Sequence, residues 1–229
     1  MSSINNSLFY ITLLSFLLVS CSQKSDSNSP FEEFMYSKME SPYVYVFQDS
    51  LNPFFERFER IVTYNDPLGD HMLIEFYNAD FVLVESFDLL QDKQYQVLSH
   101  YLYVGSQQIV AEVRDSTYIP WEGSGVFASS FPGTVDSIMF IIRNKRSLTD
   151  KRGTFEWKGE EIETIQITDS VYTLAIDLKN QREKPANGVL IHEYAKGMGK
   201  VRIRTKDGTS NLVLKAILTE AEWKTLITK

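Results

Sequence analysis

The sequence predicts a mainly β protein, in which an antiparallel sheet curls into a barrel, a half-barrel or a sandwich with a few short helices. Three observations support this fold class. Roughly ten short segments rich in β-branched and aromatic residues follow one another, with turn residues between them. Aromatic residues make up 13% of the chain, with 15 Phe and 12 Tyr, and these residue types favour strands. Long segments with a helical 3.6-residue period are few.

The first half of the chain is expected to form hairpins. Asn78-Ala79-Asp80 is a good short turn between two apolar segments. Gly105-Ser106 suits a type II′ turn, because glycine takes positive φ at its first position. The strands expected here are residues 43–47, 71–77, 81–87, 95–104 and 107–114.

The second half is expected to continue the sheet after a long loop over residues 115–135, where Pro and Gly are frequent. Residues 180–187 are expected to be a polar connection. Short helices are expected over residues 31–39 and 54–61, and a capping box at Thr219 and Glu222 predicts a C-terminal helix that packs Trp223 against the sheet. The strands expected here are residues 137–143, 154–157, 162–168, 171–178, 189–195, 200–206 and 211–218.

The N-terminus carries an export signal. The apolar run from Leu8 to Val19 is shorter than the about 20 residues that a membrane span needs, and it has the length of a signal-peptide core. It ends in Leu18-Val19-Ser20-Cys21, which resembles the lipobox of bacterial lipoproteins. The resemblance implies that Cys21 is acylated, that residues 1–20 are removed, and that the protein is anchored in a membrane by its lipid.

The polar, Ser-rich residues after the cysteine predict a flexible tether. We therefore expect residues 1–20 to be a signal peptide, 21–30 the lipidated cysteine with its tether, and 31–229 a single β-rich globular domain. Ser22 stands where an Asp often signals retention in the inner membrane, so the resemblance to diderm lipoproteins implies the outer membrane. Whether the domain faces the periplasm or the cell surface stays open.

Charge and cysteine content restrict the function classes. The net charge of −7 disfavours binding to nucleic acid. Cys21 is the single cysteine, so acylation leaves no thiol for a disulfide or for catalysis.

No catalytic, cofactor or metal signature is found. The three histidines lie on separate expected strands and lack the spacing of a ligand pair. Gly123-Ser124-Gly125 lacks the five-residue pattern of a nucleophile turn, so a loop is the simpler interpretation. We expect no cofactor and no metal, and more readily a binding protein than an enzyme.

Two patterns suggest binding surfaces. Lys200, Arg202, Arg204 and Lys206 alternate with Val201, Ile203 and Thr205, which predicts four cations on one strand face. They would contact a partner, lipid headgroups or acidic neighbours such as Glu193, or simply form a solvated face that discourages edge pairing. The second pattern is aromatic: it consists of Tyr43, Tyr45, Phe47, Tyr95, Tyr101 and Tyr103. These side chains would line an apolar pocket or fill a packed core.

The segment Tyr194-Ala195-Lys196-Gly197-Met198-Gly199-Lys200-Val201 resembles a late hairpin of β-rich envelope lipoproteins similar to the lipoprotein-localisation carriers. This resemblance implies a curved sheet with a hydrophobic concave face, and it carries over no catalytic residue.

The leading hypothesis is a non-enzymatic, outer-membrane-anchored lipoprotein whose β-domain binds a partner protein or supports an envelope assembly. The alternative is a carrier or sensor of a lipid or other hydrophobic ligand held in a half-barrel cavity. A third hypothesis is an envelope hydrolase, which would need a serine, a histidine or paired carboxylates brought together from distant strands.

Overall fold

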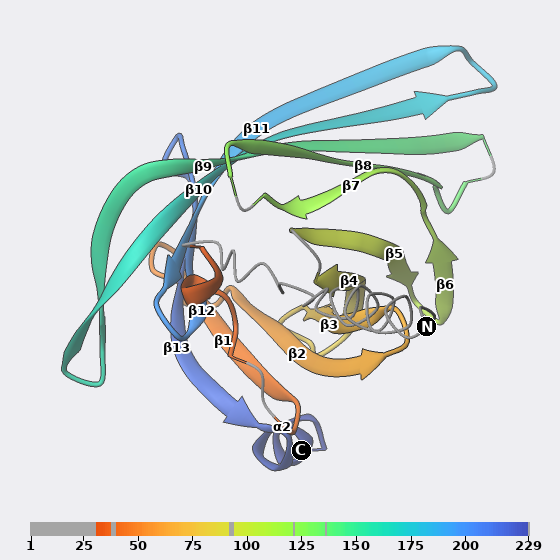
Figure 1. The fold of residues 1–229 in the computed structure, drawn as a ribbon. Coiled ribbons are helices and arrows are strands. Elements are labelled where there is room, and N and C mark those ends of the chain that lie inside the picture. The colour runs from red at the N-terminus through yellow and green to blue at the C-terminus, as the bar shows by residue number, and fades with distance from the viewer. Residues whose placement is uncertain (1–30, 38–39, 92–93, 121, 136, 229) are drawn as a thin grey trace, which may run out of the picture.

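The computed structural model describes residues 31–37, 40–91, 94–120, 122–135 and 137–228, so the lipobox, Cys21 and the tether lie outside the described residues. The described residues form one antiparallel sheet of 13 strands (Figure 1). Its strands are β1 (Tyr43–Asp49), β2 (Glu56–Asp66), β3 (Gly69–Tyr77), β4 (Leu83–Gln91), β5 (Tyr95–Val104), β6 (Gln107–Val110), β7 (Glu112–Ile119), β8 (Ser124–Pro132), β9 (Ile138–Trp157), β10 (Glu160–Asp177), β11 (Arg182–Ala195), β12 (Gly199–Thr205) and β13 (Asn211–Thr219).

The sheet closes on itself because β5 pairs with β4 on one side and with β7 on the other. Twelve of the described strands form the resulting barrel, and β6 extends β5 as a hairpin arm. The predicted fold class is confirmed, with a closed barrel as its outcome. Within the barrel, closure removes the sheet edges that an open sheet would expose.

The barrel has two different ends. At the cap end, residues 31–37 with the 3₁₀ helix η1 (Glu32–Phe34) lie against the β11–β12 turn, where the backbone N–H of Gly197 donates to the Glu33 carbonyl at 2.7 Å. The opposite end, where β1 ends and β9 begins, we call the wing end. There the β8–β9 and β10–β11 hairpins project beyond the barrel (Figure 1).

Several expected elements are wrong. Residues 54–61 were expected as a helix from the spacing of Phe54, Phe58 and Ile61, but β2 begins at Glu56. In that strand, alternation places Phe58 outside against α2 and Ile61 inside the barrel. The expected loop over 115–135 contains most of β7 and all of β8. The polar connection over 180–187 is largely the start of β11, and β9 and β10 are single strands of 20 and 18 residues.

The C-terminal helix α2 (Glu220–Ile227) is confirmed. The Thr219 hydroxyl accepts from the Glu222 N–H while the Glu222 carboxylate accepts from the Thr219 N–H, which is the predicted capping box. Trp223 packs between Phe58 and Tyr77 on the outer wall, with ring centroids 5.3 and 5.2 Å away. Within the described ranges, no helix has both the length and the apolar character of a membrane span.

The barrel interior holds the main core. Inward-facing aliphatic and aromatic side chains such as Phe47, Leu89 and Ile167 pack with Phe31 and Tyr36 of the cap end. Gly199 illustrates the fit: it adopts φ +86°, and a Cβ there would lie 2.4 Å from the Tyr36 ring. The N-terminal segment therefore closes one end of the barrel as part of its core.

Candidate functional site

The barrel interior contains a buried ion pair. Lys200 Nζ lies 2.8 Å from Glu59 Oε2 and 3.1 Å from Oε1, and Tyr36 donates its hydroxyl to the same carboxylate at 3.2 Å. Burial alone raises the pKa of the Glu59 carboxyl, but Lys200 and Arg57 outweigh burial and hold that pKa below its ordinary value. The pair is enclosed, because Glu59 is 0% and Lys200 4% exposed. It ties β2 to β12 across the interior and presents no free charge to a ligand.

A second polar cluster lies on the inner faces of β9, β10 and β11. Arg146 Nε contacts Asp169 Oδ2 at 2.8 Å, and Arg146 also donates to the Tyr118 carbonyl at 2.6 Å. His192 Nε2 is 3.7 Å from the same Asp169 oxygen, beyond hydrogen-bond range. The Asp169 Oδ1 atom and both His192 ring nitrogens are buried and have no hydrogen-bond partner among the described residues. Such atoms are commonly satisfied by a buried water.

A serine, a histidine and a carboxylate also line up within the barrel. Ser129 Oγ is 3.0 Å from His100 Nδ1, and His100 Nε2 is 3.0 Å from Glu85 Oε1. This order resembles a hydrolytic triad. Ser129 and His100 are only 1% and 0% exposed, and Phe87 stacks on the imidazole at 4.3 Å. A substrate cannot reach the Ser129 hydroxyl in this arrangement, so the chain of bonds joins β8, β5 and β4 structurally.

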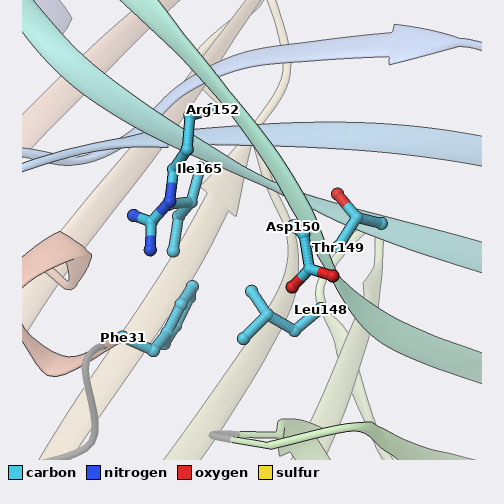
Figure 2. A pocket seen from close by; sticks show the side chains of 6 residues that line it. All are labelled: Phe31, Leu148, Thr149, Asp150, Arg152 and Ile165. Carbon is cyan, nitrogen blue, oxygen red and sulfur yellow. The ribbon is translucent and has the colours of Figure 1, made fainter.

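The hollows at the cap end are small. One of about 240 Å³ lies beside Phe31, which faces Leu148 of β9 and Ile165 of β10 (Figure 2). Another of about 260 Å³ is lined by Glu32, Met35 and Tyr95 among others. Both have charged residues in their walls, unlike the predominantly apolar pockets that hold lipids. Among the described residues, no three His, Cys, Asp or Glu side chains are grouped as a metal would require.

The four predicted cations do not form one face. A bulge between Glu193 and Tyr194 shifts the β11–β12 register, so Lys200 pairs with Tyr194 and turns inward to Glu59. Arg202 stays outside and contacts Glu193 at 2.9 Å, and Arg204 lies 3.6 Å from the same carboxylate. Lys206 is exposed in the turn after β12. The expectation of four cations on one strand face is therefore wrong. Arg202 and Arg204 instead contact the expected acidic neighbour, Glu193.

The predicted aromatic set divides into two groups. Tyr43, Tyr45 and Phe47 share the inner face of β1 and are at most 4% exposed, and Tyr95 is equally buried. A bulge between Asp88 and Leu89 of β4 shifts the register with β5, so Tyr101 and Tyr103 lie on the outer face, where Tyr103 contacts the Ser86 hydroxyl at 3.3 Å. The inner group packs within the core and does not line the hollows described above, apart from Tyr95.

The most distinctive surface is the projecting sheet at the wing end. We call it the wing, formed by residues 138–144, 171–177 and 182–188 of β9, β10 and β11. Cross-strand pairing places Met139, Ile141, Tyr172, Leu174 and Ile176 on its outer face. These side chains are half-buried and belong to neither hydrophobic core. Beyond neighbouring strands, no described element packs extensively on the wing.

The free edge of the wing is protected. Residues 182–188 of β11 pair with β10 only, since pairing with β12 starts at Leu190. The Val189 carbonyl accepts a hydrogen bond from the Lys206 backbone N–H, on the side of β11 away from β10. Backbone groups two or four residues apart in a strand point to the same side, so the backbone of Pro185 also points to the free edge. Proline offers no N–H there, and Arg182, Glu183 and Lys184 add charge. A partner is therefore expected on the face of the wing and not on its edge.

Exposed apolar side chains in the loops gather at the same end. Phe54 and Phe55 of the β1–β2 loop are 93% and 50% exposed, and Val135 of the β8–β9 loop is 60% exposed. Leu178, at the tip of the wing, is 57% exposed. The sequence reasoning missed this surface, although the apolar runs over residues 138–142 and 171–178, which have few charges on either face, were a usable signal.

Comparison with protein-family models and with curated proteins finds no match. Two solved structures are similar. A candidate lipoprotein from Parabacteroides distasonis ATCC 8503 shares 12% identity with a TM-score of 0.39, over 80% of this chain and 97% of that one. A candidate exported protein with a YmcC-like fold from Bacteroides fragilis NCTC 9343 shares 11% identity with a TM-score of 0.40, over 80% of this chain and 98% of that one.

Proposed function

We propose that this protein is a lipid-anchored, non-enzymatic envelope protein that binds a partner protein through the outer face of the wing. The observation that carries the proposal is the apolar outer face, on which no described element packs extensively. Exposed apolar surface on a soluble domain is typical of interaction sites. The interior offers less support for a carrier, because its core is packed and the hollows at the cap end are small.

The anchor and the wing fit together in space. Cys21 precedes Phe31 by ten residues, and ten extended residues reach at most about 35 Å. Phe31 lies at the cap end, in contact with Tyr194 at a ring distance of 5.5 Å. A lipid on Cys21 would thus hold the barrel by its cap end and direct the wing away from the anchoring membrane. This geometry favours a protein as the partner over that membrane.

The outer face of the wing is apolar and nearly balanced in charge. Strand pairing sets Arg143 opposite Tyr172 and Glu183 opposite Ile176, so one cation and one carboxylate of the described wing strands lie on this face. Asp177, Arg182 and Lys184 lie on the opposite face of the wing. The surface that complements the outer face is therefore mainly apolar.

Site-specific crosslinking in intact cells tests the proposal. A photoreactive residue replaces Leu174 on the outer face of the wing, and a matched one replaces Thr168 on the same face of β10 within the barrel. We expect one discrete protein adduct from position 174, none from position 168, and loss of the position 174 adduct in an Ile141→Glu background. An adduct of exactly two copies, an equal yield from both positions, or no adduct at all would contradict the proposal.

The anchor is tested separately by metabolic palmitate labelling. We expect the wild-type chain to incorporate label and Cys21→Ser to lose it, with Ser25→Thr in the expected tether as a nearby control that leaves the lipobox intact. If the wild-type protein incorporated no label, the lipid anchor would be wrong, and the binding of a partner through the wing would still have to be tested by crosslinking.

A further inference from the structure

A hollow of about 420 Å³ lies outside the barrel, beside α2. Its walls are Val46, Phe58, Phe81, Ala216, Leu218 and Leu226, and its rim holds Glu56 and Glu222. Val46 pairs with both Phe58 and Ala216 in the sheet register, so these three side chains share the outer face of adjacent strands. The small side chain of Ala216 leaves the space that a larger residue would fill. We call this hollow the α2 groove.

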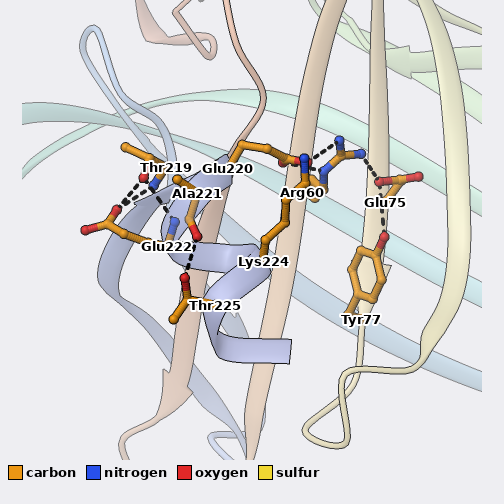
Figure 3. Close-up of polar contacts among 9 residues, drawn as sticks. All are labelled: Arg60, Glu75, Tyr77, Thr219, Glu220, Ala221, Glu222, Lys224 and Thr225. Atoms are coloured by element: carbon orange, nitrogen blue, oxygen red, sulfur yellow. Dashed lines mark hydrogen bonds and ion pairs between the residues drawn. The ribbon is translucent and has the colours of Figure 1, made fainter. Parts of the chain in front are cut away.

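The helix beside the groove is held in place by polar contacts. Arg60 of β2 donates to Glu220 at 2.9 Å and to Glu75 at 2.6 Å, and Tyr77 donates to Glu75 at 3.2 Å (Figure 3). Trp223, only 3% exposed, fixes the same helix on Phe58 and Phe81. These contacts lie on one side of α2, while Glu222 and Leu226, one turn apart, border the groove. The groove is therefore bounded by a fixed helix and a rigid sheet.

The rim of the groove is anionic. Glu56 makes no ion pair with the other described residues, and Glu222 accepts hydrogen bonds from the Thr219 backbone and hydroxyl at 2.7 and 2.8 Å. These bonds lower the pKa of the Glu222 carboxyl, so it is charged at neutral pH. None of the described residues that line the groove is Lys or Arg. A fatty-acid carboxylate would be repelled there, whereas an ammonium group would be attracted.

The size of the groove limits its occupant. Its volume of about 420 Å³ corresponds to about one turn of α-helix, so an amphipathic peptide helix would bury only a short part of its apolar face there. The groove lies within the range of about 300–1,000 Å³ that is typical of small-molecule sites, and it has their apolar walls with few polar groups.

We propose that the α2 groove binds a single-chain amphiphile with a cationic head group. The alkyl chain lies against Val46, Phe58, Ala216 and Leu218, and the ammonium group lies between Glu56 and Glu222. This site is separate from the wing, and the proposal holds whether or not the wing binds a partner.

Fluorescence quenching by brominated amphiphiles tests the site. The full chain with Cys21→Ser, which has no acyl chains of its own, is titrated with 11-bromoundecylammonium and with 11-bromoundecanoate below their micelle concentrations. Bromine quenches tryptophan at short range, and Trp223 lies directly behind the groove wall, with its ring centroid 5.3 Å from that of Phe58 and 5.7 Å from that of Phe81. We expect saturable quenching with at least about tenfold higher affinity for the ammonium probe at low salt, and a smaller preference at 1 M salt. Trp223→Phe is expected to abolish the saturable quenching.

Variants of the groove give the matched controls. Ala216→Leu fills the groove and is expected to weaken binding at least about tenfold, while Thr154→Leu on the exposed β9–β10 hairpin leaves it unchanged. Glu56→Gln reduces the preference for the ammonium probe, and Glu161→Gln on the distant β9–β10 hairpin does not. If Ala216→Leu fails to fold, Leu226→Lys on α2 replaces it. Quenching that survives in Trp223→Phe, or that is equal for both head groups, overturns the proposal.

Discussion

The three strands of the wing, β9, β10 and β11, also run through the barrel body, yet the two regions differ in what covers them. In the barrel, β10 presents Ile165 and Ile167 to the interior, at 3% and 1% exposure. Farther along the same strand, Leu174 and Ile176 are half-buried and belong to no core. The outer face of β10 changes in composition at the same place, from Gln166, Thr168 and Ser170 along the barrel to Tyr172, Leu174 and Ile176 on the wing. The wing is therefore an apolar surface on which no other described element packs extensively.

The charges of the two regions differ in the same way. Inside the barrel, Glu59 with Lys200 and Asp169 with Arg146 form ion pairs that are almost completely buried. On the wing, Arg182 and Lys184 are exposed and have no ion-pair partner among the described residues. The barrel charges hold strands together, and the wing charges are available to another molecule. The comparison predicts that barrel substitutions change stability and wing substitutions change binding.

The largest expected effect comes from breaking the buried pair. Lys200→Met leaves the Glu59 carboxylate without its main counterion in the interior, so we expect the free energy of unfolding to fall by about 3–5 kcal/mol in urea titrations. Lys184→Met, the wing counterpart, is expected to change it by less than about 0.5 kcal/mol. The double variant Glu59→Leu with Lys200→Met removes both charges and should recover most of the loss. Equal effects at positions 200 and 184 would erase the distinction between the two regions.

A smaller difference is expected between two isoleucines of β10. Ile167→Ala removes a fully buried side chain from the barrel and should cost about 2–5 kcal/mol of unfolding free energy. Ile176→Ala, on the half-buried outer face of the wing, is expected to cost less than about 1 kcal/mol. The same variant should nevertheless reduce the crosslinked adduct from position 174. If Ile176→Ala strongly lowered the free energy of unfolding but left the yield of the adduct unchanged, the outer face of the wing would stabilise the fold and would not bind the partner.

Local sequence patterns predicted much of the fold. The strands over residues 200–206 and 211–218, the turn over residues 78–80 and the Thr219 capping box are all encoded within a few residues, and each is found. Closure of the sheet is not local, because the β4–β5 and β5–β7 pairs depend on the shape of the whole barrel. The helix expected over residues 54–61 failed for a related reason. Phe58 and Ile61 are compatible with one helix face, but tertiary packing places them on opposite sides of β2.

The site residues were harder to predict, because β-bulges decide which side chains share a face. A bulge in the β11–β12 pair turns Lys200 inward, and one in the β4–β5 pair separates Tyr95 from Tyr101 and Tyr103. A one-residue shift moves every later side chain to the other face, and no feature of composition marks where it occurs. The Ser129–His100–Glu85 chain was equally hidden, since its members come from three separate strands.

Two histidines give the last and smallest contrast. His192 lies inside the barrel, and burial lowers its pKa although Asp169 opposes that effect. His71 lies on the outer face of β3, where burial would lower its pKa but Asp88 and Asp66 outweigh burial and raise it. The two groups should therefore act on stability in opposite directions as the pH changes.

The sign follows from which state binds the proton. Below the ordinary histidine pKa of about 6.5, the unfolded chain binds a proton at position 192 that the folded barrel resists, so stability falls with decreasing pH by at most about 1.4 kcal/mol per unit until the lowered folded pKa is reached. At position 71 the folded state binds the proton better, so its contribution is present below about 6.5 and is lost as the pH rises through the raised folded pKa. Urea unfolding between pH 8 and pH 5 should become less steeply dependent on pH in His192→Asn and more steeply dependent in His71→Asn. If both variants shifted the profile in the same direction, the opposite roles of the barrel interior and its outer face would be wrong for these histidines.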